Sequence, residues 1–200
     1  MITYSDHMAN GRDLADGLPK GNAWFSQRSV LLDPATHLND TFIGLAANAC
    51  MRIPLQGRVL DLGCGDGFLD YYIYSRRASS IIGVDASEEA IEEARRYHAK
   101  DSIEYMLGDI LDVKTDPSSF DVVILRGVLP GIGIENAPAI ADLAKHALRP
   151  GGWFVGDTCH DGSYLARMLR GFWVSHTVEA ATGMPSGRNN YFWQAQKEPE

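Results

Sequence analysis

The chain has 200 residues, 45% of them hydrophobic, and carries 18 basic against 26 acidic side chains, for a formal net charge of -8. A chain of this length and composition can bury one hydrophobic core, so we expect a single globular domain over residues 1–200. The acidic balance argues against nucleic acid as a partner, because nucleic-acid-binding domains usually present a basic patch.

Cysteine content and hydropathy exclude further classes of protein. The three cysteines are an odd number without CxxC spacing, which indicates neither a disulfide framework nor a zinc site. No segment approaches the roughly 18 consecutive apolar residues of a membrane-spanning helix. We therefore expect a cytoplasmic protein with no membrane partner and no bound metal, and we leave open whether it is a monomer or a homodimer.

The first 56 residues precede the regular part of the pattern. Residues 22–32 and 38–51 each have the composition and periodicity of a helix. Two helices are too short to build a second hydrophobic core of their own. We therefore predict that residues 1–56 form a helical cap or lid packed on the main domain.

Residues 57–160 alternate between short β-rich runs and amphipathic segments. This alternation is typical of βαβ units around a buried parallel sheet. The predicted strands are 58–63, 81–87, 103–109, 120–127 and 151–158, and the predicted helices are 68–78, 88–97 and 138–148.

The pattern changes after His160. Residues 161–172 have a helical pattern, whereas 173–182 and 191–196 have the composition of strands. The loop between these two strands, "GMPSGRNN", is rich in turn-forming residues and suits an antiparallel hairpin. We therefore predict an α/β fold in which a mostly parallel sheet ends in an antiparallel hairpin within residues 161–200.

Three glycines follow the first predicted strand, in the stretch "VLDLGCGDGFLD". Gly63, Gly65 and Gly67 lie where that strand gives way to a helix, which is the usual ligand site of an open α/β sheet. A dinucleotide fingerprint, GxGxxG, would need glycine at the position of Phe68, so the spacing is GxGxG instead. A tight turn that closes the strand without any ligand is the alternative.

Acidic residues end the next two predicted strands. Asp85 follows the second strand, where a carboxylate can accept hydrogen bonds from ribose hydroxyls and would repel a 2′-phosphate. Asp109 follows the third strand and could accept a hydrogen bond from the amine of adenine, with Ala86 and Ile110 against the faces of the ring. One such acid is usually a turn residue, but the combination with the glycine loop indicates a nucleoside site.

Five segments in order resemble the family of class I S-adenosylmethionine-dependent methyltransferases: "VLDLGCGDG", "IIGVDAS", "MLGDI", "FDVVILRGVLPGI" and "LRPGGWFVGDT". They cover residues 57–160, and the terminal hairpin is similar to the family's last two strands. The resemblance implies a Rossmann-like, seven-stranded, mostly parallel sheet with helices on both faces. It also implies S-adenosyl-L-methionine as cofactor and S-adenosyl-L-homocysteine as product.

The resemblance further implies which residues surround the cofactor. They are Asp61, Gly63 and Gly65 at the methionine part, Asp85 and Ala86 at the ribose, Asp109 and Ile110 at the adenine, and Arg126 beside the sulfonium. Gly67 is expected to serve the close packing of the following helix instead.

Methyl transfer to an acceptor needs little more than positioning, because the sulfonium is already an activated leaving group. His160, after the fifth strand, is the candidate general base, and a solvent-exposed loop histidine is the alternative. Trp24, Phe25 and Arg28 in the predicted cap, together with Leu129, are the candidate acceptor-binding residues. Packing of the cap on the sheet would explain the aromatic residues equally well.

The fourth segment narrows the class of acceptor. Its "LRGVLPG" lacks the Asn/Asp-Pro-Pro-aromatic motif of enzymes that methylate the amino groups of nucleic-acid bases. We therefore predict methyl transfer to oxygen or nitrogen of a small-molecule acceptor. The alternatives are a protein or RNA methyltransferase and a non-catalytic subunit that binds the cofactor.

Overall fold

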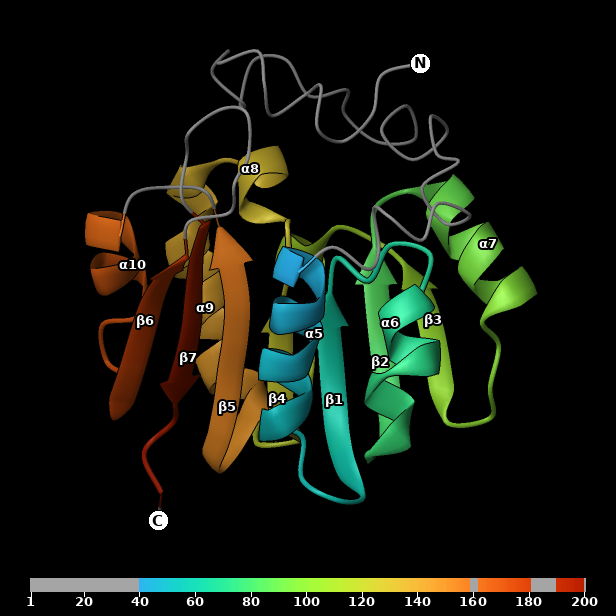
Figure 1. Ribbon diagram of the computed structural model, residues 1–200, viewed down its shortest axis with the longest axis horizontal. Helices are drawn as coiled ribbons and strands as arrows, with labels where there is room; N and C mark the ends of the chain where they lie inside the picture. The colour runs from blue at the N-terminus through green and yellow to red at the C-terminus, as the bar shows by residue number, and fades with distance from the viewer. Residues whose placement is uncertain (1–39, 159–161, 181–189, 200) are drawn as a thin grey trace.

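The computed structural model describes residues 40–158, 162–180 and 190–199, which form one seven-stranded sheet flanked by helices (Figure 1). The strand order is β3-β2-β1-β4-β5-β7-β6. The pairs from β3 to β5 are parallel, and β7 runs antiparallel to both β5 and β6. The strands are β1 (Gly57–Leu62), β2 (Ala78–Asp85), β3 (Ile103–Leu107), β4 (Phe120–Leu125), β5 (Leu148–Thr158), β6 (Val174–Ala180) and β7 (Asn190–Gln196).

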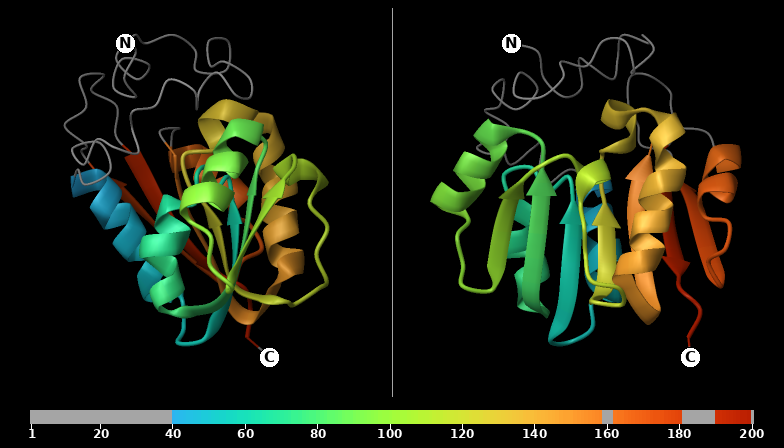
Figure 2. Two further views of the ribbon diagram at one scale, coloured as in Figure 1. Left: turned by 90° about the vertical axis from the view of Figure 1, so that its right-hand side faces the viewer. Right: turned by 180° about the vertical axis from the view of Figure 1, so that it is seen from behind.

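Helices cover both faces of the sheet, as Figure 2 shows from the side and from behind. On one face lie α5 (Asp40–Arg52), α6 (Phe68–Tyr72) and α7 (Glu88–Tyr97), and on the other lie α9 (Ala137–Ala147) and α10 (Gly162–Met168). Four short elements complete the described chain: η2 (Tyr74–Arg76), η3 (Ile110–Asp112), α8 (Leu129–Ile132) and η4 (Ile134–Asn136). The predicted α/β fold with helices on both faces is confirmed.

Each face of the sheet has its own hydrophobic core. Ile53, Ile81 and Ile91 belong to the core beneath α5, α6 and α7. Leu62 and Phe154 belong to the core beneath α9 and α10. All six residues of β4 are buried, as expected for a central parallel strand that is covered on both sides.

The described part of the predicted cap is α5, which packs along the face of the sheet (Figure 1). The Arg52 guanidinium lies 3.8 Å from the centre of the Trp153 ring, and its Nε donates a 2.7 Å hydrogen bond to Gln194 Oε1. These contacts tie α5 to β5 and β7. Residues 1–39 of the predicted cap lie outside the described residues.

The predicted helix over 68–78 is too long. The α-helix ends at Tyr72, a single turn of 3₁₀ helix follows, and β2 already begins at Ala78. The run from Tyr71 to Tyr74 is aromatic and β-branched, so its helix propensity is poor. Tyr74 is fully buried against the sheet, which favours the early end of the helix.

Other predicted boundaries shift by a few residues. β3 ends at Leu107 and β4 at Leu125, each two residues before the predicted end, and β5 begins three residues early, at Leu148. Leu148 pairs with Phe120 across the sheet. β5 therefore includes residues 148–150, which precede the predicted strand 151–158. Among the described residues, no helix is both long enough and apolar enough to cross a bilayer.

Candidate functional site

The predicted cofactor residues gather where β1, β2, β3 and β4 end at their carboxyl termini. From β1 the chain continues to β2 and β3 on one side and then crosses to β4 on the other side, so the strand order reverses beside β1. In open α/β sheets the crevice outside such a reversal is the usual ligand site. The glycine loop, residues 63–67, lies at this position.

The glycine loop folds back over the end of β2. Gly63 and Cys64 both donate backbone hydrogen bonds to the carbonyl oxygen of Val84, at 2.7 and 3.1 Å. Gly63, Gly65 and Gly67 have φ values of 85°, 59° and 73°, a region that side chains other than glycine's rarely adopt. The three glycines are therefore required by the shape of the loop itself.

Two of these glycines also lie too close to neighbouring side chains to carry one of their own. A Cβ on Gly63 would lie 2.1 Å from Cγ2 of Val128, and a Cβ on Gly67 would lie 2.2 Å from Oη of Tyr105. Gly67 thus has a packing role, as predicted, but its neighbour is Tyr105 of β3. The Tyr105 hydroxyl also donates a 3.2 Å hydrogen bond to the Gly67 carbonyl.

Asp85 holds the glycine loop from the end of β2. Its Oδ2 accepts a 2.9 Å hydrogen bond from the backbone N–H of Gly65, and its Oδ1 accepts one of 2.9 Å from Ser87. Ser87 in turn caps α7 by accepting a hydrogen bond from Ala90. Each carboxylate oxygen has two lone pairs, so the half-buried Asp85 can still accept hydrogen bonds from a ligand.

Asp109 lies at the end of the neighbouring strand, on the exposed side. Its Oδ1 accepts a 2.9 Å hydrogen bond from Leu111 and caps η3. This bond leaves Oδ2 for other donors. Ala86 is exposed next to Asp85, whereas Ile110 is buried in the core, so contact of Ile110 with an adenine ring stays a prediction.

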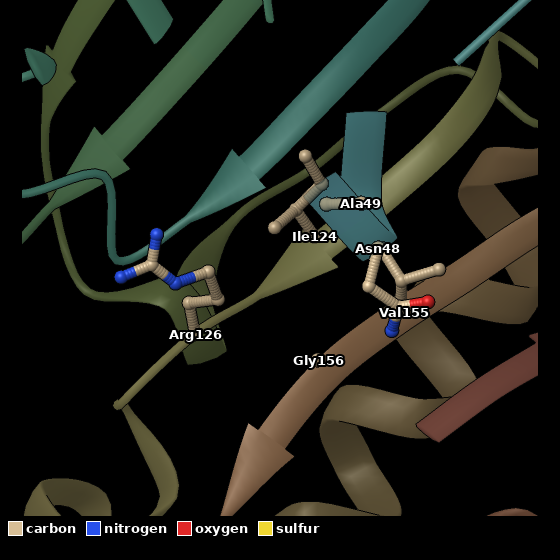
Figure 3. A pocket seen from close by; sticks show the side chains of 6 residues that line it. All are labelled: Asn48, Ala49, Ile124, Arg126, Val155 and Gly156. Carbon is tan, nitrogen blue, oxygen red and sulfur yellow. The ribbon is translucent and has the colours of Figure 1, made fainter. Parts of the chain in front are cut away.

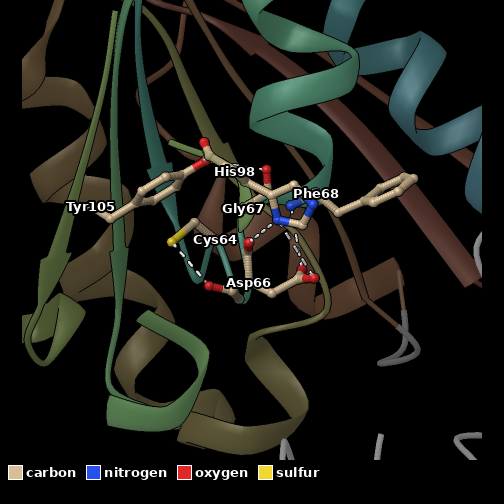
Figure 4. A network of polar contacts seen from close by, with 7 residues as sticks. Cys64, Asp66, Gly67, Phe68, His98 and Tyr105 are labelled. Atoms are coloured by element: carbon tan, nitrogen blue, oxygen red, sulfur yellow. Dashed lines mark hydrogen bonds and ion pairs between the residues drawn. The ribbon is translucent and has the colours of Figure 1, made fainter. Parts of the chain in front are cut away.

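A second aromatic and polar network supports the loop from behind (Figure 4). His98, at the end of α7, has its Nδ1 2.6 Å from the backbone carbonyl oxygen of Asp66. Because a carbonyl oxygen can only accept, Nδ1 carries the proton and donates it. The rings of Phe68 and Tyr71 lie 5.9 and 5.6 Å from the buried imidazole. These contacts tie the glycine loop to the end of α7.

Asp61 lies beneath the loop and meets the carboxyl group of Asp70 from α6. Burial raises the pKa of Asp61 to about 6, while the charge of Arg126 and a hydrogen bond with Asp70 act to lower it. Burial and the nearby Asp61 raise the pKa of Asp70 well above its usual value. Each carboxyl group therefore keeps its proton to a higher pH than an exposed aspartate does.

Arg126 follows β4 and lies beside these acids. It lines a narrow crevice with Asn48 and Ala49 of α5 and three strand residues, and its side chain points away from Asn48 (Figure 3). Its charge also opposes the rise in pKa that burial causes at Asp157. Asp157 Oδ1 accepts a 3.0 Å hydrogen bond from the Gly127 N–H, which ties the end of β5 to the segment after β4.

Sequence reasoning missed Asp70 and Asp157. Asp157 ends a predicted strand, so the rule that singled out Asp85 and Asp109 could have found it. Asp70 carried no such signal, because a polar residue between aromatic ones in a short helix reads as solvent-facing.

The structure leaves the predicted acceptor and catalytic residues largely untested. Trp24, Phe25, Arg28 and His160 lie outside the described residues. Leu129 is fully buried in the hydrophobic core, which favours packing, and its contact with an acceptor stays a prediction. Within the described ranges there is no group of three or more His, Cys, Asp or Glu side chains that could hold a metal ion.

Comparison with known proteins identifies this arrangement. Residues 59–152 match the family described as methyltransferase domain. The ubiquinone biosynthesis O-methyltransferase of Xylella fastidiosa is 33% identical over 144 residues, which are 70% of this chain and 56% of that protein. The chain thus spans about half the length of this curated relative.

Solved structures share the fold. A putative S-adenosylmethionine-dependent methyltransferase from Listeria monocytogenes aligns with a TM-score of 0.65 at 20% identity, over 78% of this chain and 97% of that one. The N-methyltransferase NodS from Bradyrhizobium japonicum, crystallised with S-adenosyl-L-homocysteine, aligns with a TM-score of 0.67 at 17% identity, over 81% and 89%. The glycine loop, the strand order and the matched domain together show that the chain belongs to the class I S-adenosylmethionine-dependent methyltransferases.

Proposed function

We propose that this chain binds S-adenosyl-L-methionine at the crevice beside β1 and transfers its methyl group to an oxygen or nitrogen atom of a small molecule. The observation that carries the proposal is the geometry of Asp85. Its two oxygens are fixed by the backbone N–H groups of Gly65 and Ser87, so the carboxylate is already oriented before a ligand arrives. A fixed acceptor at the end of β2 suits the two hydroxyls of a ribose.

The other residues of the crevice fit the remaining parts of the cofactor. Asp61, near the end of β1, is proposed to offer its carboxylate to the ammonium group of the methionine part. The exposed Asp109 suits the exocyclic amine of adenine. Gly63, Gly65 and Arg126 would border the methionine part and the sulfur, and Ala86 and Ile110 the adenine.

Bound S-adenosyl-L-methionine supplies a methyl group on a positively charged sulfur. The sulfur is a leaving group that needs no further activation. The chain then has to hold the acceptor atom in line with that methyl group and exclude competing nucleophiles. Trp24, Phe25, Arg28 and Leu129 are proposed to border the acceptor. His160 is proposed to remove a proton from it where the acceptor is a hydroxyl or an amine.

A small acceptor is supported by the charge of the chain and by its relatives. The net charge of -8 is poorly suited to docking on nucleic acid. The relative from Xylella fastidiosa is named for O-methylation in ubiquinone biosynthesis, which favours oxygen as the acceptor atom here.

The test is to incubate the purified protein with radiolabelled S-adenosyl-L-methionine and an extract separated into small molecules, proteins and RNA. We expect label in the small-molecule fraction and release of S-adenosyl-L-homocysteine. Label confined to protein or RNA would overturn the small-molecule acceptor and favour the macromolecular alternative. Tight cofactor binding without transfer to any fraction would favour a non-catalytic subunit.

A further inference from the structure

Two buried carboxyl groups meet beneath the glycine loop, and the function proposed above uses one of them. Asp61 lies on β1, two residues after Val59, so both side chains face the helices α5 and α6. Asp70 reaches the same place from α6. Their exposed fractions are 5% and 1%. A second buried acid at this position needs a physical explanation, because burying a charge is costly.

The surroundings of the pair require a proton. Among the described residues, no hydrogen-bond donor reaches Oδ1 of Asp61 or either oxygen of Asp70. Two ionised carboxylates offer acceptors alone and would repel each other. One proton between them supplies the missing donor and leaves a single negative charge.

The backbone of β2 leaves room for Asp70. Gly83 pairs with Asp61 across the β1–β2 ladder. A Cβ on Gly83 would lie 2.9 Å from Oδ2 of Asp70 and 2.9 Å from Sγ of Cys64. The missing side chain at position 83 is what allows the Asp70 carboxyl group to lie against Asp61.

Other ionisable groups face the pair from every neighbouring element. They are Cys64 and Asp66 from the glycine loop, Asp85 from the end of β2, Tyr105 from β3, Tyr74 from η2 and Arg126 from the end of β4. Arg126 favours ionisation of the pair, whereas burial and the neighbouring acids oppose it. The balance favours one negative charge at neutral pH.

We propose that Asp70 is a positioning residue that holds Asp61, through a shared proton, as a single carboxylate directed at the ammonium group of the bound cofactor. This inference rests on the proposed function, in which Asp61 receives the methionine part. Asp70 itself does not touch the cofactor. Its role is to donate a hydrogen bond to Asp61 from the side opposite the ligand.

The proposal has a consequence for the effect of pH on binding. When the pH falls below about 6, a second proton enters the pair, and the ammonium group of the ligand loses its charged partner. Affinity then declines by about tenfold per pH unit, as expected for one linked proton. An amide in place of Asp70 donates the same hydrogen bond as the protonated carboxyl group, so Asp61 should titrate as in the wild type. A leucine removes this donor, whose hydrogen bond lowers the pKa of Asp61, and should therefore raise that pKa.

The experiment is calorimetric titration of the full chain with S-adenosyl-L-homocysteine from pH 5 to pH 8. It compares the wild type with Asp70→Asn, with Asp70→Leu, and with Asp101→Asn as a control at an exposed carboxylate. We expect Asp70→Asn to follow the wild type from pH 8 to pH 5, with the same loss of affinity below about pH 6. Asp70→Leu should bind more weakly at both, and Asp101→Asn should follow the wild type.

A second ligand distinguishes a failure of the role proposed for Asp70 from a failure of the proposed function. Methylthioadenosine keeps the adenine and the ribose but lacks the amino-acid group, so its affinity should not decline below pH 6. If Asp70→Leu and the wild type lose affinity for S-adenosyl-L-homocysteine over the same pH range, the role of Asp70 is refuted while the proposed function stands. If the wild type binds neither ligand at any pH, the proposed function itself fails.

Discussion

Two acidic regions at neighbouring strand ends, Asp85 after β2 and the Asp61–Asp70 pair beneath the loop, are treated in opposite ways by the fold. Asp85 is half-buried, and each of its oxygens receives a backbone N–H. The pair is buried and has no such donors among the described residues. The presence of an aspartate at a strand end therefore does not by itself determine the charge of its side chain. The backbone donors within reach also decide whether the carboxyl group ionises or keeps a proton.

The largest effect is expected from Gly63→Ala, because the glycine loop lies over both acidic regions. The new methyl group would overlap with Val128 and would need a left-handed backbone. We expect a loss of about 3 kcal/mol in the free energy of unfolding, measured by urea denaturation, from the sum of overpacking and backbone strain. Adding Val128→Ala should recover the overpacking part.

The control for this prediction is Gly131→Ala in α8. A Cβ there meets nothing within 4 Å. This variant should change stability little. Equal losses at both glycines would contradict the steric explanation.

Asp85→Ala removes the carboxylate at the end of β2 and leaves both carboxyl groups of the Asp61–Asp70 pair in place. Removing a charged acceptor of two ligand hydrogen bonds costs about 3 kcal/mol, or roughly a 100-fold weaker affinity for S-adenosyl-L-homocysteine. The loss should be somewhat smaller at pH 5 than at pH 8, because removing the charge of Asp85 also lowers the pKa of Asp61. Calorimetry at the two values checks this, with Asp101→Ala as the matched control, and undiminished binding would remove the ribose role of Asp85.

Asp70→Asn alters the buried pair, and we expect it to change how the free energy of unfolding depends on pH. Because the folded state raises the pKa values of both acids, it binds more protons than the unfolded state above about pH 4. The stability contributed by the pair is therefore greatest at low pH and is lost as the pH rises. We expect the variant to gain stability relative to the wild type as the pH rises from 4 to 7, measured by urea denaturation. A constant difference would argue against the shared proton.

Asp109→Asn tests the third strand end, where the smallest effect is expected. The amide oxygen can still cap η3 in place of Oδ1. The amide nitrogen would then face the adenine amine and could not accept its hydrogen bond. We expect about fivefold weaker binding of S-adenosyl-L-homocysteine, about 1 kcal/mol, with an unchanged melting temperature. A fall in melting temperature would mean that capping accounts for the role of Asp109.

The amino-acid sequence was sufficient to predict the α/β sheet and to find candidate ligand-binding residues at the ends of three of its strands. The alternation of strands and helices is a local pattern, and Gly63, Asp85 and Asp109 follow directly from where the strands end. Asp70 could not be found in this way, because its burial depends on Gly83, which is adjacent in space and not in sequence. The early end of α6 escaped for a similar reason: tertiary packing of Tyr74 overrode the helical pattern.

The central place of β1 also bears on how the protein folds. β1 is the first strand among the described residues, yet its partner β4 follows much later, so that Val59 pairs with Val122. Contacts between such distant segments require long loops to close, which slows folding relative to local contacts. The crevice at the carboxyl end of β1 therefore depends on a contact of this slow kind, because its two walls belong to segments that are far apart in the chain.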